Sequence, residues 1–261
     1  AAPGLGIYIA DFLGLKGVFD VAGILCVLSA FFFFLLKGEK KIKKTAGVKL
    51  RLKNFLAVSV LGYSVIGGIF SFTNGIISTY LLTYSKLLHI SNIGVYFTIN
   101  AMVLFLVRPC AGKLMDKKGL NIVAFPGLLC TAGSMILLAE ANRFPTTGLV
   151  VILLSGMIRA LGQGAVNPAL QTECIKRVGK ERSGVATSTF YLGGDIGQGI
   201  GPMVAGVVVE MLAGHLIAYK VIFYLCGLLL LGAMAGLWII NHKQDKEERE
   251  IHENICIYHK R

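Results

Sequence analysis

Two charged side chains lie deep inside long apolar stretches of the sequence. Arg159 lies about 12 residues into the stretch 147–171, and Asp195 is at a similar depth in the stretch 183–209. At a rise of about 1.5 Å per residue, two spanning helices would carry both charges to the middle of a bilayer. A charge there costs at least about 2.5 kcal/mol, so it usually faces a cavity or a partner. We therefore expect a charged centre, used for proton coupling or held as a static salt bridge. For Arg159, bonding to backbone carbonyls is a further alternative.

Aromatic and amide residues near these charges suggest a binding pocket. Tyr63, Phe70 and Asn74 are seven and four residues apart, which places them on one face of a helix. Gln163 and Asn167 follow Arg159 in the same apolar stretch. Small-molecule pockets combine apolar walls with a few polar groups. We predict that these five residues line a substrate cavity; packing between helices is the alternative.

A basic segment from Arg108 to Gly119 combines turn residues with a carboxylate. Gly112 and Gly119 allow tight turns. Asp116, next to Lys117, could meet a helix N-terminus, a contact that stabilises a carboxylate by about 0.3–1 kcal/mol. Such a contact can lock two helices in one conformation and release them in another. An ordinary basic loop is the alternative.

A glycine-rich segment occupies the second half of the stretch that contains Asp195. Gly197, Gly201 and Gly206 are nearly on one helix face. Small residues at such spacing let helices approach closely in lipid. Pro202 weakens the backbone hydrogen-bond ladder and can bend the helix. We expect Gly201, Pro202 and Gly206 to take part in conformational gating.

The elements that position these residues follow from the composition. The chain of 261 residues is 55% hydrophobic and 15% charged, with a mean hydropathy of +0.70. Soluble domains carry about 25% charged residues. Lipid must therefore surround much of the chain, which leaves helices or a closed barrel. Because the apolar runs are long and do not alternate as barrel strands do, we predict an all-α integral membrane protein.

Seven apolar stretches are long enough to span a bilayer, which takes about 20 residues. An eighth, residues 1–9, looks like the end of another span, and the first residue looks like a truncation point. The seven stretches are 17–36, 54–83, 93–110, 120–139, 147–171, 183–209 and 221–240.

The basic residues alternate between the two ends of these predicted spans. Of the 26 Lys and Arg residues, 21 fall in the segment 37–53, the segment 108–118, the segment 173–182 and the tail from residue 241. This is the positive-inside pattern, which puts those loops and the C-terminus in the cytoplasm. It accounts for the net charge of +12 without nucleic acid, for which the sequence has no binding motif.

Three motifs together resemble the major facilitator superfamily. The segment from Gly112 to Gly119 is similar to its G-x-L-x-D-(R/K)-x-G loop, which has a weaker copy between helices 8 and 9. The segment around Arg159 is similar to a helix 10 signature, with its Gln one place later than in the common helix 4 form. The opening residues 2–6 resemble the end of a helix 5 motif of drug:proton antiporters, and the glycines from 197 to 206 echo it on helix 11.

The resemblance implies a major facilitator fold running from the end of helix 5 to helix 12. Residues 1–36 would hold the end of helix 5 and helix 6, and 37–53 a basic cytoplasmic linker. Residues 54–240 would form the C-terminal six-helix bundle, and 241–261 a cytoplasmic tail. The remaining N-terminal helices of the same protein are then an expected partner.

The function implied is secondary active transport by alternating access, as proton-coupled export of small amphipathic compounds across a bacterial cell membrane. A sugar-like nutrient symporter or uniporter is the alternative within transport. A seven-helix receptor or structural membrane protein is the alternative from another class. The sequence shows no nucleophile–base pair, phosphate-binding loop, CxxC pair or metal cluster. We therefore expect neither an enzyme nor a cofactor or metal.

Overall fold

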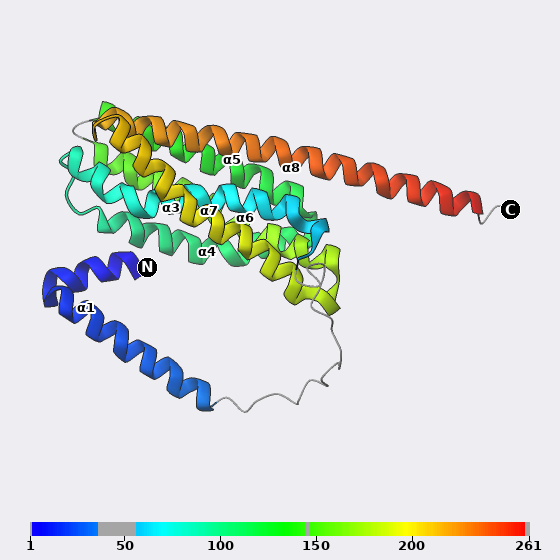
Figure 1. Ribbon diagram of the computed structural model, residues 1–261, viewed down its shortest axis with the longest axis horizontal. Helices are drawn as coiled ribbons and strands as arrows, with labels where there is room; N and C mark the ends of the chain where they lie inside the picture. The colour runs from blue at the N-terminus through cyan, green and yellow to red at the C-terminus, as the bar shows by residue number, and fades with distance from the viewer. Residues whose placement is uncertain (1, 36–55, 145–146, 259–261) are drawn as a thin grey trace.

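Long helices make up nearly all of the part of the chain that the computed structural model describes, residues 2–35, 56–144 and 147–258 (Figure 1). Seven of the described segments are long and apolar enough to cross a membrane, which confirms the predicted all-α membrane class. The helices are α1 (Ala2–Leu35), α3 (Leu61–Leu87), α4 (Gly94–Lys118), α5 (Leu120–Ala139), α6 (Gly148–Val178), α7 (Ser183–Met211) and α8 (Leu216–Tyr258).

Helix α1 consists of two arms that meet at Gly14 (Figure 1). The backbone of Gly14 has φ 72° and ψ 177°, a conformation that glycine adopts without steric cost. The break lies between the predicted end of one span within residues 1–9 and the predicted start of another near residue 17. The basic segment 37–53 lies outside the described residues.

Helices α3 to α8 form one bundle. Helix α7 packs along α3, α3 also packs on α8, and α5 lies between α8 and α6. Helix α4 packs on α6 and in turn contacts α1. We call the end at which α3 and α7 begin the basic end, because α4 and α6 finish there in Lys117, Lys118, Lys176 and Arg177.

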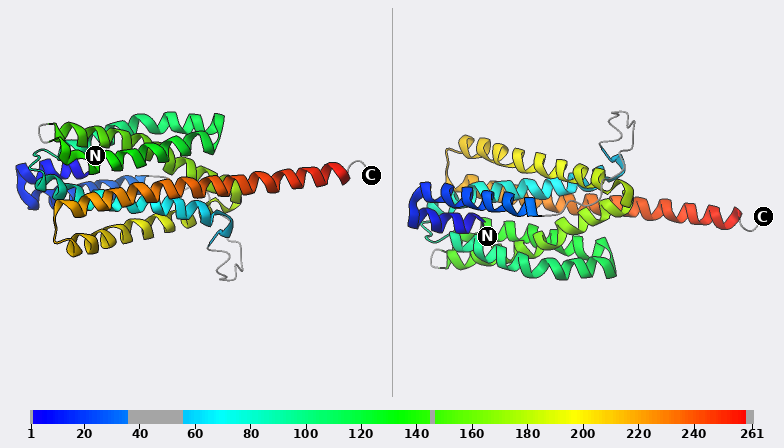
Figure 2. Two further views of the ribbon diagram at one scale, coloured as in Figure 1. Left: turned by 90° about the horizontal axis from the view of Figure 1, so that it is seen from above. Right: turned by 90° about the horizontal axis from the view of Figure 1, so that it is seen from below.

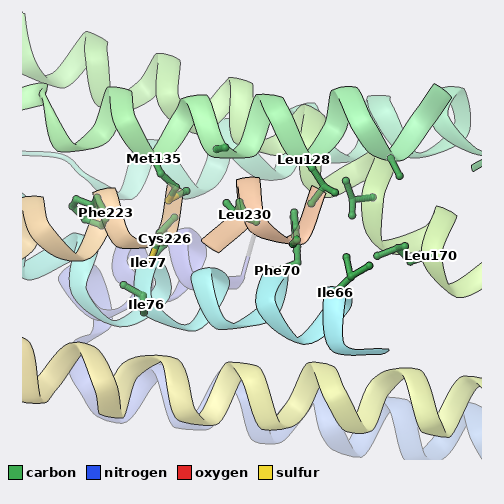
Figure 3. Close-up of a cluster of buried hydrophobic side chains, with 14 of the residues drawn as sticks. Ile66, Phe70, Ile76, Ile77, Leu128, Met135, Leu170, Phe223, Cys226 and Leu230 are labelled. Atoms are coloured by element: carbon green, nitrogen blue, oxygen red, sulfur yellow. The ribbon is translucent and has the colours of Figure 1, made fainter. Parts of the chain in front are cut away.

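The core lies where α3, α5 and α8 meet (Figure 3). Phe70 of α3 is 1% exposed, and Leu128 of α5 and Leu230 of α8 are fully buried. Figure 3 shows aliphatic and aromatic side chains, together with Met135 and Cys226, filling the space between these helices. This packing buries the face of α3 that carries Phe70.

Helices α3 and α7 approach through glycines. A Cβ at Gly197 would overlap the backbone oxygen of Gly68, and one at Gly201 would overlap that of Phe72. On the facing helix α3, a Cβ at Gly68 would lie 2.8 Å from the backbone oxygen of Gly193. Glycines at positions 193, 197 and 201 therefore form one contact strip, the arrangement expected of small-xxx-small packing.

Helix α8 is longer than the predicted span 221–240. It begins at Leu216 and continues without interruption to Tyr258. Figure 2 shows this extension projecting beyond the bundle. The segment predicted as a tail is, as far as Tyr258, a direct continuation of α8. Within α8, the Trp238 ring stacks on the His242 ring.

Large apolar side chains remain exposed on α1, α4 and α7. Phe12 is 87% exposed, and Phe105 and Met203 are 78% and 72% exposed. Surfaces of this kind are unfavourable in water and fit contact with lipid or with further helices.

Candidate functional site

Two cavities lie on the face formed by α3, α4, α6 and α7. The first has a volume of about 240 Å³ and includes Arg159, Gln163 and Asn74 in its wall. The second has a volume of about 370 Å³ and lies nearer the basic end, with Arg108, Asn167 and Gln171 in its wall. We call them the Arg159 cavity and the Arg108 cavity.

One polar stripe on α6 connects the two cavities. Arg159, Gln163, Asn167 and Gln171 follow each other at intervals of four residues, so they lie on one face of the helix. At 1.5 Å per residue the stripe is about 18 Å long. Gln163 lines the Arg159 cavity and Asn167 lines the Arg108 cavity, and that these cavities bind a substrate stays a prediction. Gln171 was not predicted to line a cavity, although its spacing from Asn167 was a usable signal.

Other helices complete the cavity walls with polar groups that the sequence analysis did not select. Asn100 and Ser78 line the Arg159 cavity, and Asn100 donates from its amide to the backbone oxygen of Gly156, at 3.1 Å. Gln198 of α7 lines the same cavity. In the Arg108 cavity, the Tyr191 hydroxyl donates to the Gln171 side chain at 3.3 Å.

Arg159 is deeply buried, with 5% of its surface exposed. Its Nη2 donates to Oδ1 of Asn74, and its Nε has no hydrogen-bond partner. The phenol of Tyr96 also lies beside the guanidinium. Helix α6 permits this arrangement at Gly156, where a Cβ would clash with the ring of Tyr96. Tyr63 and Phe70 do not share this site.

The expected pair of Arg159 and Asp195 is not formed. Asp195 is exposed on α7, and among the described residues no ion pair involves either side chain. The position of each charge within its apolar stretch predicted a similar depth in the membrane. It could not predict the rotation of α7 about its own axis, which decides where Asp195 points. The neutral amide of Asn74 occupies the place next to Arg159 that the carboxylate was expected to fill.

Tyr63 and Phe70 belong to the packed interior, which corrects their predicted place in a cavity. Tyr63 is 0% exposed, and its hydroxyl donates to Oδ1 of Asn241 at 2.8 Å. The Asn241 amide donates in turn to Asn121 on α5. The guanidinium of Arg177 lies 5.1 Å from the centre of the Tyr63 ring. This polar cluster joins α3, α5, α6 and α8 at the basic end.

The segment from Gly112 to Gly119 is mostly helical rather than a loop. Gly112, Asp116 and Lys117 belong to the last turns of α4, and Asp116 is exposed. The turn between α4 and α5 is the single residue Gly119, with φ +80°. The expected turn at Gly112 is therefore wrong, whereas the one at Gly119 is confirmed.

The gating residues predicted on α7 have different surroundings. Gly201 is buried against the backbone of Phe72, whereas a Cβ at Gly206 would meet only the Tyr80 hydroxyl. That hydroxyl donates to the backbone oxygen of Pro202 at 3.1 Å. Close packing is therefore confirmed for Gly201 but is looser at Gly206.

A second charged cluster lies at the opposite end of the bundle. The Glu140 carboxylate accepts a hydrogen bond from the Tyr224 hydroxyl and forms ion pairs with Arg143 and Lys220. The hydrogen bond and the two cations hold the pKa of Glu140 below its ordinary value, although partial desolvation opposes them. This cluster ties the end of α5 to α8.

Comparison with known proteins identifies the family. The Major Facilitator Superfamily matches this chain in two overlapping segments, residues 1–202 and 144–254. The chain belongs to the major facilitator superfamily. This membership confirms the resemblance carried by the three motifs and removes the seven-helix receptor alternative.

The relatives that the chain resembles are longer proteins. An uncharacterised transporter of major-facilitator type from Methanocaldococcus jannaschii is 26% identical over 226 residues, 80% of this chain and 55% of the relative. The fosmidomycin resistance protein of Escherichia coli is 24% identical, over 54% of this chain and 33% of the relative. A putative multidrug resistance protein of an Enterobacter species is 27% identical, over 67% and 36%. The chain thus spans between a third and about half of the length of these relatives.

Proposed function

We propose that the whole protein is a secondary active transporter that moves a small amphipathic molecule by alternating access. The observation that carries the proposal is the polar stripe from Arg159 to Gln171, which lines two cavities within otherwise apolar helices. Polar and charged side chains at membrane depth are costly and mark the path of a substrate or ion. Two relatives that resemble the chain have names that refer to drug resistance, which supports export.

In this proposal the bundle α3–α8 is the C-terminal half, and the N-terminal helices of the same protein close the cavities from the other side. Residues 1–36 belong to the N-terminal half, and 37–53 form the linker. Transporters with repeated halves work by rocking one half against the other around a midplane site. The basic end and the tail face the cytoplasm, because the excess of Lys and Arg follows the positive-inside rule.

Proton coupling and gating are assigned to separate residues. Asp195 is the candidate proton carrier, since it is an exposed carboxylate of α7, one turn from the cavity-lining residues Tyr191 and Gln198. Asp116 and Lys117, at the basic end of α4, are proposed as the latch between conformations. Gly201 and Pro202 hold α7 on α3 during the movement.

The test is transport by the full-length protein in proteoliposomes. A panel of anionic, neutral and cationic amphipathic compounds is offered with and without an imposed pH gradient. We expect gradient-dependent accumulation of at least one class, lost on adding a protonophore and lost in Asp195→Asn. Equal movement with and without the gradient would remove proton coupling and favour a uniporter. No movement of any class would contradict transport of amphipathic compounds.

A further inference from the structure

Arg159 is a buried cation without a carboxylate partner. Its guanidinium is bonded to the neutral amide of Asn74, and its Nε has no partner. The ion pairs of the described residues all lie elsewhere, at Glu140 and at Glu173. An arginine cannot relieve such a cost by losing its proton. A buried cation in this state is stabilised by any anion that can reach it.

The Arg159 cavity gives an anion that access. Arg159 lies in its wall, and the Asn74 oxygen is already used by the guanidinium, which leaves the Asn74 amide nitrogen as a further donor. Gln163 also lines the cavity, and its side-chain amide can donate through the nitrogen. Ile77, Phe97 and Leu104 supply apolar walls.

We propose that the Arg159 cavity binds the carboxylate or phosphonate group of a small amphipathic organic acid. Guanidinium groups bind both oxyanions through paired N–H donors. The apolar walls then hold the hydrocarbon part of the same molecule. This inference rests on the proposed transport function and names its substrate class.

The charge along the face favours an anion over a cation. Among the described residues that line the two cavities there is no carboxylate, whereas each cavity has an arginine. Asp195 lies on α7 between the cavity-lining positions 194 and 198 but lines neither cavity. An organic cation entering the Arg159 cavity would therefore meet a like charge without a compensating group.

A matched ligand series tests the inference on the purified full-length protein. The probes are 4-phenylbutyrate and phenylphosphonate as acids, 4-phenylbutyramide as the neutral form and 4-phenylbutylamine as the cation. Equilibrium binding and the shift in unfolding temperature are measured for each. We expect the wild-type protein to bind the acids about tenfold or more tightly than the amide and the amine.

Two variants direct the test at Arg159. Arg159→Gln should weaken binding of the acids by about 10- to 100-fold and leave the amide unchanged. Asn74→Asp places a carboxylate beside the guanidinium as an internal counter-ion. This variant should therefore fold well and bind the acids more weakly than the wild-type protein does. The control is Arg143→Gln, because Arg143 lies at the opposite end with a 71% exposed side chain, and it should keep wild-type binding.

The outcomes separate this inference from the proposed function. Equal binding of acid and amide, tightest binding of the amine, or an unchanged acid preference in Asn74→Asp would each overturn the anion site. Failure of both acids to bind the folded wild-type protein would overturn it as well. Gradient-driven transport of neutral or cationic compounds alone would support the transport function and contradict the anion site. Acid binding that depends on Arg159, in a protein that transports nothing, would support the anion site and contradict the transport function.

Discussion

Among the single residues of the site, Arg159 is a buried charge whose neighbour is the neutral amide of Asn74. Its depth in the apolar stretch predicted a cavity or a partner beside it, and in the structure it lies in a cavity wall with 5% of its surface exposed. Its partner could not be predicted, because the rotation of α7 about its axis depends on the glycine contacts with α3 and not on depth. Asn74, which was selected only as a polar group of the cavity, is the residue that holds the guanidinium.

The Tyr63 cluster predicts a stability effect without a substrate effect. Tyr63→Phe keeps the buried ring but removes the hydroxyl that donates to Asn241 at 2.8 Å. The side-chain oxygen of Asn241, a residue that is 8% exposed, then has lost this donor. Leaving a buried acceptor unpaired costs about 1–3 kcal/mol of folding free energy. We expect a lower unfolding temperature in detergent and unchanged substrate affinity. Tyr191→Phe is the control for the unfolding temperature, because its hydroxyl belongs to an exposed side chain in the Arg108 cavity. A change of affinity in Tyr63→Phe with full stability would restore Tyr63 to the cavity.

The Glu140 cluster predicts a response to acid. The Tyr224 hydrogen bond and the cations Arg143 and Lys220 keep the folded-state pKa of Glu140 below 4.5, its ordinary value. The cluster therefore stabilises the fold fully above pH 4.5, and this contribution is lost as the pH falls through the lower folded-state pKa.

Unfolding measured between pH 7 and pH 3 should show this loss in the wild-type protein. Glu140→Gln should be less stable at pH 7 and lack this component of the acid response. Glu210→Gln, an exposed carboxylate at the same end of the bundle, should behave as the wild-type protein does. Identical acid profiles for Glu140→Gln and the wild-type protein would show that the cluster contributes nothing.

At the scale of elements, the contact between α3 and α7 shows what a glycine pattern can and cannot predict. The sequence selected Gly197, Gly201 and Gly206, and the structure uses the spacing of four residues from Gly193 through Gly201. Gly206 lies one residue beyond that spacing, so it meets the side chain of Tyr80 instead of a backbone. The number and order of the helices could be predicted because apolar length determines them. The helix ends could not, because α4 and α8 continue into polar sequence.

The strip predicts graded effects of leucine along α7. Gly201→Leu would overlap the backbone oxygen of Phe72, which cannot move aside, so we expect a loss of about 1–3 kcal/mol in stability and strongly reduced transport. Gly206→Leu should cost less, because the Tyr80 hydroxyl can rotate away. Gly199→Leu is the matched control, since a Cβ there meets nothing within 4 Å. Unfolding temperature and initial transport rate are compared for the three. Equal behaviour of Gly199→Leu and Gly201→Leu would contradict close packing at the strip.

At the scale of the whole molecule, the polar stripe of α6 lies on the face where residues of α3, α4, α6 and α7 line two cavities. The apolar surfaces of α1, α4 and α7 remain exposed around it. Composition predicted the membrane, and the distribution of Lys and Arg predicts the orientation. The cavities depended on tertiary packing, since the face of α3 that carries Tyr63 was assigned to a pocket but is buried in the core.

The central claim is that these cavities open alternately to the two sides of the membrane. The most direct measurement is the labelling of single cysteines, Ser71→Cys in the Arg108 cavity and Ser78→Cys in the Arg159 cavity, in full-length protein whose native cysteines are replaced. A membrane-impermeant thiol reagent is added from either side, with the pH gradient imposed in each direction. We predict that Ser71→Cys is labelled from the cytoplasmic side and Ser78→Cys from the outer side, and that reversing the gradient changes the two rates in opposite directions. Rates that rise and fall together, or that ignore the gradient, would contradict alternating access.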